Sequence, residues 1–194
     1  MIQTGTGQTR KWTDDMKEFY IWDPLLRIFH WALVVGFTAN ALLLEEDGSA
    51  HQLVGYIILG LLVVRLVWGL FGPRYARFSS FFPTPGAVLG QIADIATGRG
   101  RVHLGHSPLG ALMIWNIVVT LLAISATGYM LTIAGFSGEE WVEEAHEVLV
   151  IWAEISVVAH IAAVVWESIR TRVNLPRAMV TGVKNVPSEA TVVE

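Results

Sequence analysis

Four long apolar stretches, separated by polar segments, dominate the pattern of this chain. They run from about Pro24 to Leu44, His51 to Phe71, Pro108 to Thr132 and Trp141 to Arg170. Each is long enough to cross the hydrocarbon core of a bilayer, roughly 30 Å thick, as a helix. Only helices and closed barrels satisfy their own backbone hydrogen bonds in lipid. The pattern therefore predicts an all-α fold, an integral membrane four-helix bundle.

The polar segments differ sharply in charge. Eleven of the thirteen Lys and Arg lie in the amino-terminal segment, in the long loop between the second and third stretches, and in the carboxyl-terminal segment. The positive-inside rule places both termini and the long loop in the cytoplasm; in a Gram-negative bacterium the membrane would be the inner one and the opposite side the periplasm. The other two loops face the periplasm and carry eight acidic residues and no Lys or Arg: Glu45, Glu46, Asp47, Glu139, Glu140, Glu143, Glu144 and Glu147.

The same pattern divides the chain into three parts. Residues 1–20 are polar and lack the apolar core of a signal peptide, so we expect a cytoplasmic tail. Residues 21–184 form the transmembrane domain, and residues 185–194 form a second cytoplasmic tail. Within the long loop, Thr84-Pro85 is typical of a helix start, and the next apolar residues fall on one face. They predict an amphipathic helix on the membrane surface: Val88, Leu89, Ile92 and Ile95.

Composition narrows the chemistry. The chain is 53% hydrophobic and 15% charged, with a mean hydropathy of +0.51, which is typical of a membrane protein. It has no cysteine. Disulfides, iron–sulfur clusters, thiolate zinc sites and covalently attached haem are therefore excluded. A haem in this chain would be a non-covalent b type.

Four histidines lie in the apolar stretches: His30, His51, His146 and His160. The last two are fourteen residues apart, which places them on one helix face about 21 Å apart along the axis. Because successive spans run in opposite directions, His30 matches His160 in the inner half of the membrane, and His51 matches His146 near the outer surface. Two pairs at matched depth are what two stacked haems with bis-histidine ligation require.

Other interpretations of these residues are weaker. A lone membrane histidine is often a hydrogen-bonded packing residue, but four at matched depth are not explained in this way. Zinc would need three or four ligands in one cluster, and His146-Glu147 does not continue into an HExxH motif. A proton path stays open, although it does not need pairs at equal depth. Arg27 and Arg65 could bind propionates of the inner haem, and Arg27 could equally extend to the interface.

Several short segments match a known family in order and spacing. They are Ile21-Trp22-Asp23-Pro24, Arg27-Ile28-Phe29-His30-Trp31, Gly105-His106-Ser107-Pro108-Leu109-Gly110, Ala126-Thr127-Gly128, the pair His146 and His160, and the run from Asn174 to Gly182. With them the chain resembles the bacterial di-haem cytochrome b proteins, which include prokaryotic cytochrome b561 and the cytochrome b subunits of nickel–iron hydrogenases. The resemblance implies four helices, two b haems, traffic with quinone, and ligands at His30, His51, His146 and His160.

Three functions fit such a protein. It could carry electrons between the quinone pool and a periplasmic redox protein, oxidise superoxide and reduce quinone, or anchor a larger oxidoreductase such as a hydrogenase. Eight outer carboxylates repel an anion and attract a basic protein, which favours the first, with a c-type cytochrome as partner. We also expect quinone and membrane lipid as partners, and we expect no nucleic acid partner. His103 is interpreted as a solvated loop residue. The role of His106, whether at a propionate, at a quinone or as a helix cap, stays open.

Overall fold

The computed structural model describes residues 16–46 and 48–193. Most of the expected amino tail, with Arg10 and Lys11, and the acidic Asp47 lie outside the described residues. Four helices are long and apolar enough to cross a membrane, with mean hydropathy from 1.4 to 2.3. They are α1 (Pro24–Leu42), α2 (Ser49–Phe71), α4 (Pro108–Leu131) and α5 (Glu140–Thr171). The all-α membrane bundle is confirmed, and each span begins and ends within two residues of the expected boundary.

The helix starts follow from local sequence chemistry. The Asp23 side chain accepts a hydrogen bond of 3.1 Å from the Leu26 amide, and Pro24 occupies the first turn of α1. Ser107 caps α4 in the same way, accepting from the Gly110 amide at 3.2 Å. These side chains satisfy amides that have no partner inside the helix, and proline needs none. Two spans are thus fixed at their first residue by a cap followed by proline.

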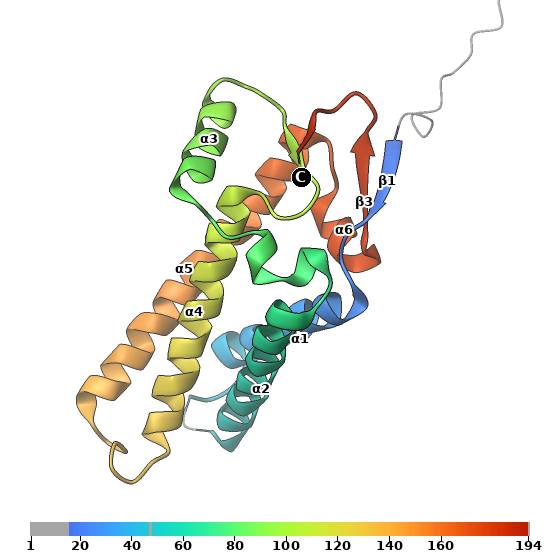
Figure 1. Cartoon of the computed structure of the whole chain (residues 1–194). Coiled ribbons are helices and arrows are strands. Elements are labelled where there is room, and N and C mark those ends of the chain that lie inside the picture. Colours follow the sequence, from blue (N-terminus) through green and yellow to red (C-terminus); the bar gives the residue numbers. More distant parts are fainter. Residues whose placement is uncertain (1–15, 47, 194) are drawn as a thin grey trace, which may run out of the picture.

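The four spans form two pairs. Helix α1 packs against α2, α4 packs against α5, and α2 contacts α4 between the pairs. Figure 1 shows the two pairs diverging toward the end that carries the α1–α2 and α4–α5 loops, called here the loop end. Only 11–22% of the residues in the most apolar window of each span are buried inside the protein. Direct helix contact therefore accounts for a small part of what surrounds these spans.

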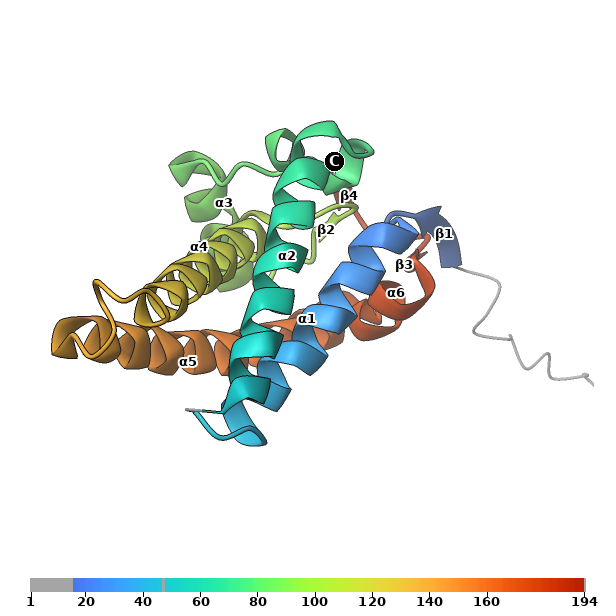
Figure 2. The ribbon, with the colours of Figure 1, turned by 90° about the horizontal axis from the view of Figure 1, so that it is seen from below.

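The opposite end of the bundle carries all the shorter elements, and we call it the cap (Figures 1 and 2). Strand β1 (Met16–Tyr20) pairs antiparallel with β3 (Val183–Pro187), and β2 (Val102–His103) pairs parallel with β4 (Val192–Val193). Parts of both expected tails, 1–20 and 185–194, therefore form strands. The cap also contains α3 (Pro85–Ala96), α6 (Leu175–Thr181) and the short 3-10 turns η1 (Arg74–Ala76) and η2 (Phe78–Ser80).

Helix α3 is the amphipathic helix expected in the long loop. It begins after Thr84, whose hydroxyl accepts from the Ala87 amide. Its polar Gln91 and Asp94 are buried against the protein, whereas Leu89 is 66% exposed. An exposed apolar face beside the ends of the spans suits a helix that lies in the membrane surface.

Lys184, on β3, ties the cap together. Its side chain is 3% exposed, and its ammonium donates to the backbone oxygens of His103, Leu104 and Gly105 at 2.9, 2.8 and 3.3 Å. Burial lowers the pKa of Lys184 to about 8, and the charge of Glu167 opposes this shift. Strand β3 thereby holds the turn that leads into α4.

We expect Lys184→Met to destabilise the protein by about 1–3 kcal/mol, because buried carbonyls would lose their donor. Thermal loss of haem absorbance or of helical circular dichroism measures this. Lys17→Met, at an exposed position on β1, is the matched control and should change stability little. Equal stability of the two variants would contradict the role given to Lys184.

Candidate functional site

The four span histidines lie on three helices and fall into two pairs. His30 on α1 lies near enough to His160 on α5 for the charge of one ring to act on the other. The same holds for His51 on α2 and His146 on α5. The structure thus brings together the same pairs that the depth argument predicts. We call His30 and His160 the cap-side pair, and His51 and His146 the loop-side pair.

The two pairs are separated along α5. Fourteen residues between His146 and His160 correspond to about 21 Å of helix. Ala153 lies midway between them and is 2% exposed, so a small residue separates the two levels. All four histidines are half-buried. Their rings are therefore held by the helices without being enclosed by protein alone.

A hydrogen bond fixes the ring of His146. The hydroxyl of Thr127 on α4 lies 2.9 Å from Nδ1 of His146 and 3.0 Å from the backbone oxygens of Ala123 and Ile124. Because the hydroxyl donates its one proton to a backbone carbonyl, it must accept a hydrogen bond from Nδ1–H of His146. The lone pair on Nε2 of His146 is therefore free to bind a metal ion. Gly128 permits the close approach, since a Cβ there would lie 3.1 Å from Cε1 of His146. The role of Thr127 does not follow from the sequence pattern.

Two further rings, those of His30 and His51, are not fixed by a hydrogen bond at Nδ1. The Nδ1 atoms of His30 and His51 are buried and have no hydrogen-bond partner. No protein hydrogen bond therefore fixes Nδ1 of these two rings, and a neutral imidazole at either position has a ring nitrogen that can bind iron. Within the described residues, no three His, Asp or Glu side chains gather as a metal cluster. Paired neutral imidazoles at two levels suit an axially ligated haem iron better than zinc.

A comparison with known families agrees with this geometry. The family model described as prokaryotic cytochrome b561 matches residues 21–182, which is most of the chain. The chain belongs to this family. It is therefore a membrane b-type cytochrome that binds haem b and acts in electron transfer. A comparison with curated proteins and another with solved structures each found no match.

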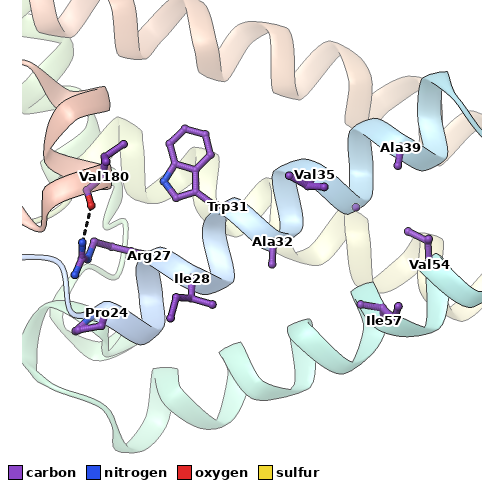
Figure 3. A pocket seen from close by; sticks show the side chains of 11 residues that line it. Pro24, Arg27, Ile28, Trp31, Ala32, Val35, Ala39, Val54, Ile57 and Val180 are labelled. Carbon is purple, nitrogen blue, oxygen red and sulfur yellow. Dashed lines mark hydrogen bonds between the residues drawn. The ribbon is translucent and has the colours of Figure 1, made fainter.

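The two arginines have different surroundings in this cytochrome. Arg27 donates to the backbone oxygen of Val180, and its Nε is buried without a partner. It lies at one end of an apolar groove of about 750 Å³ along α1 and α2, which His30 does not line (Figure 3). Arg65 is 3% exposed, donates to the backbone oxygen of Ala76 at 3.0 Å, and lies 4.5 Å from the centre of the Phe78 ring. Arg65 thus attaches η1 and η2 to α2.

His106 stands outside the spans, just before α4. Its ring lies between those of Trp22 and Phe81, at centroid distances of 4.6 and 4.3 Å. Burial, together with the smaller effect of the charges of Lys184 and Arg65, lowers the pKa of His106 to about 3. His106 is therefore a neutral ring at physiological pH.

His106 also borders a polar cavity of about 360 Å³ in the cap. Asp94 lines this cavity and forms an ion pair of 3.3 Å with Arg101. Gln91, also in the lining, accepts from the Leu109 amide at 2.8 Å. His103, expected to be a solvated loop residue, is part of the same lining, and its Nδ1 is buried without a partner. Charged, amide and aromatic groups therefore converge at this end of the spans.

The cap should be sensitive to acid through His106. The unfolded chain takes up a proton near pH 6.5, whereas the folded chain resists it down to about pH 3. Stability is therefore full above pH 6.5 and should fall as the pH drops toward 3, by up to about 1.4 kcal/mol per pH unit. Denaturation measured between pH 7 and 4 tests this. His106→Phe should flatten the dependence, and an unchanged slope in that variant would contradict the assignment.

Proposed function

We propose that this cytochrome holds two b haems and carries electrons between the quinone pool and a periplasmic redox protein such as a c-type cytochrome. The observation that supports the proposal best is the pairing of four histidines at two levels about 21 Å apart. His30 and His160 would hold one haem, and His51 and His146 would hold the other. Haem b supplies reversible one-electron oxidation and reduction when bound.

The chain's own residues orient the ligands. Thr127 holds His146 in the tautomer that leaves Nε2 free, which is the task of an outer partner of a ligating histidine. The apolar faces of the spans exclude water from the same region. Arg27 and Arg65 stay predicted partners of the cap-side propionates. The unpartnered Nε of Arg27 supports that role for Arg27, whereas Arg65 already serves Ala76 and Phe78.

The loop end supports a basic protein partner. Both connecting loops lie at this end (Figure 1). Of the eight acidic residues expected there, the seven that the structure describes are all exposed: Glu45, Glu46, Glu139, Glu140, Glu143, Glu144 and Glu147. An acidic surface raises the local concentration of a cationic protein and lowers that of an anion such as superoxide. If the cap is cytoplasmic, as the positive charges predict, this surface faces the periplasm.

The cap supports traffic with quinone. Its polar cavity of about 360 Å³ combines the aromatic Tyr75 and Phe81 with the donors Arg101 and His106. A quinone ring offers two carbonyl oxygens to such donors and an aromatic face to such rings. Ligand sites commonly combine a mostly apolar lining with a few placed polar groups.

The haem content tests the proposal directly. Purified protein should contain two haems per chain in a pyridine haemochrome assay. His30→Ala or His160→Ala should remove one haem, and His51→Ala or His146→Ala should remove the other, since each pair holds one iron. His103→Ala is the control and should retain both. One haem in the intact protein, or loss of the same spectroscopic haem in the His30 and His51 variants, would contradict the pairing.

The partner has its own test. Oxidation of the reduced protein by a basic c-type cytochrome should slow by roughly tenfold or more in association rate as salt rises. The reason is that the reach of exposed charges shortens from about 30 Å at 0.01 M to about 8 Å at physiological ionic strength. Changing Glu139, Glu140, Glu143 and Glu144 together to Gln should flatten this dependence and leave the haem content unchanged. Stopped-flow spectroscopy measures both rates.

Glu18→Gln with Glu189→Gln, at exposed positions in the cap, is the control for that experiment and should keep the wild-type salt dependence. Superoxide should respond in the opposite direction, reacting faster once the acidic residues of the loop end are neutral. Fast oxidation of superoxide by the wild-type protein, with no reaction toward cytochromes at any salt concentration, would replace the proposed function with the superoxide reaction. Stable copurification with a hydrogenase would favour the anchor role.

A further inference from the structure

Glu154 is a carboxylate in the middle of the longest span. It lies on α5 between the two histidine levels, eight residues after His146 and six before His160, which is about 12 and 9 Å along the axis. Its side chain is exposed, and among the described residues none donates a hydrogen bond to it or pairs with it. Ionisable groups at this depth in a membrane are costly, and they usually pair with one another or with another polar group.

The residues around Glu154 form a regular seam. They follow one another at alternating steps of three and four residues, and the others are exposed and branched at Cβ. The seam consists of Ile151, Glu154, Val158, Ile161 and Val165, with the four apolar members 50–67% exposed. This spacing is that of the a and d positions of a left-handed helix pair. A single polar residue within such a seam fixes the register and the number of helices.

The seam is separate from the other working faces of α5. One face turns Ala153 and Ser156 inward, with the Ser156 hydroxyl 2.8 Å from Nδ2 of Asn116 on α4. His146 and His160 lie on the same side of the helix as Ala153, seven residues from it in each direction, and the seam lies about a third of a turn away. Within the described residues, neither α1 nor α4 covers the seam, because its members stay exposed. It is therefore available to a helix from outside this chain.

We propose that the seam is the interface with a second copy of this chain. Two copies with the same orientation in the membrane are related by an axis along the membrane normal, so each residue on a central seam meets its own copy at equal depth. A carboxylic acid is both donor and acceptor, so Glu154 can pair with Glu154 of the second copy without any other polar group. The other seam residues are all Ile or Val, so the seams of the two copies can pack against each other with side chains of similar size and shape.

The absence of cysteine from the chain gives a clean test. Val158→Cys and Ile161→Cys each introduce the sole thiol, on the seam. Oxidation in native membranes should join two copies through either one. Val63→Cys on α2, 51% exposed at a similar depth, is the control and should give little dimer. Lack of a cross-linked dimer with both seam variants, or a cross-link to a different polypeptide in place of the second copy, would overturn the proposal.

Glu154 itself is tested in the Val158→Cys background. Glu154→Gln should preserve cross-linking, because an amide also donates and accepts. Glu154→Leu should weaken dimerisation by about threefold to fifteenfold, the range expected for one hydrogen bond between membrane helices. Cross-linking that is unchanged by Glu154→Leu would overturn the pairing of the carboxyls. The haem content of every variant should stay at the wild-type value, so this result stands apart from the tests of the proposed function.

Discussion

An imidazole inside a bilayer must have a partner for its ring nitrogens, and the placement of the spans depends on this constraint. Lipid offers no hydrogen bonds, so an unsatisfied ring nitrogen costs free energy for as long as the helix stays in the membrane. Thr127 supplies one such partner to His146. Buried Nδ1 atoms of His30 and His51 have none from the protein. On our proposal, each haem iron binds two of these imidazoles, and the cofactor holds together helices that bury little of one another.

Because the spans contact one another so little, the hydrogen bonds that set their spacing are concentrated in the cap. The spans diverge toward the loop end (Figure 1), so their spacing has to be set where they meet. At that end Asp23 accepts from both the Leu26 amide and Trp68 Nε1, which joins the start of α1 to α2. Lys184 holds the turn before α4, and the backbone oxygen of Gly182 accepts from the amides of Ile21 and Trp22. The two ends of the chain thus fix the frame in which the histidines face one another.

The spans and their helix caps could be predicted from the sequence, because they depend on long apolar runs and on residues close together in the chain. The spans are long apolar runs, two of which start at a proline, and the amphipathic α3 has a cap followed by proline. The histidine pairs followed from depth, which needs only residue counts and span direction. These features depend on local sequence and on the thickness of the bilayer.

Features that depend on distant contacts were not predicted. Strands β1 and β3 are short and lie at opposite ends of the chain, so neither has a pattern of its own. The burial of Lys184 and the hydrogen bond from His146 to Thr127 arise only when separate helices and strands meet. Glu154 is recognisable in the sequence as a charged residue within an apolar run. Its exposure, however, can be known only once the position of α4 beside α5 is known. The strands of the cap add to the all-α bundle without changing it.

Spin quantitation by electron paramagnetic resonance of the oxidised, purified protein tests the central claim most directly. Iron with two imidazole ligands is low-spin, so the account predicts low-spin ferric signals that integrate to two spins per chain, with no high-spin component. One spin per chain would contradict the two-level arrangement. A substantial high-spin signal would show that at least one iron lacks its second imidazole, and would contradict the pairing of His30 with His160 or of His51 with His146.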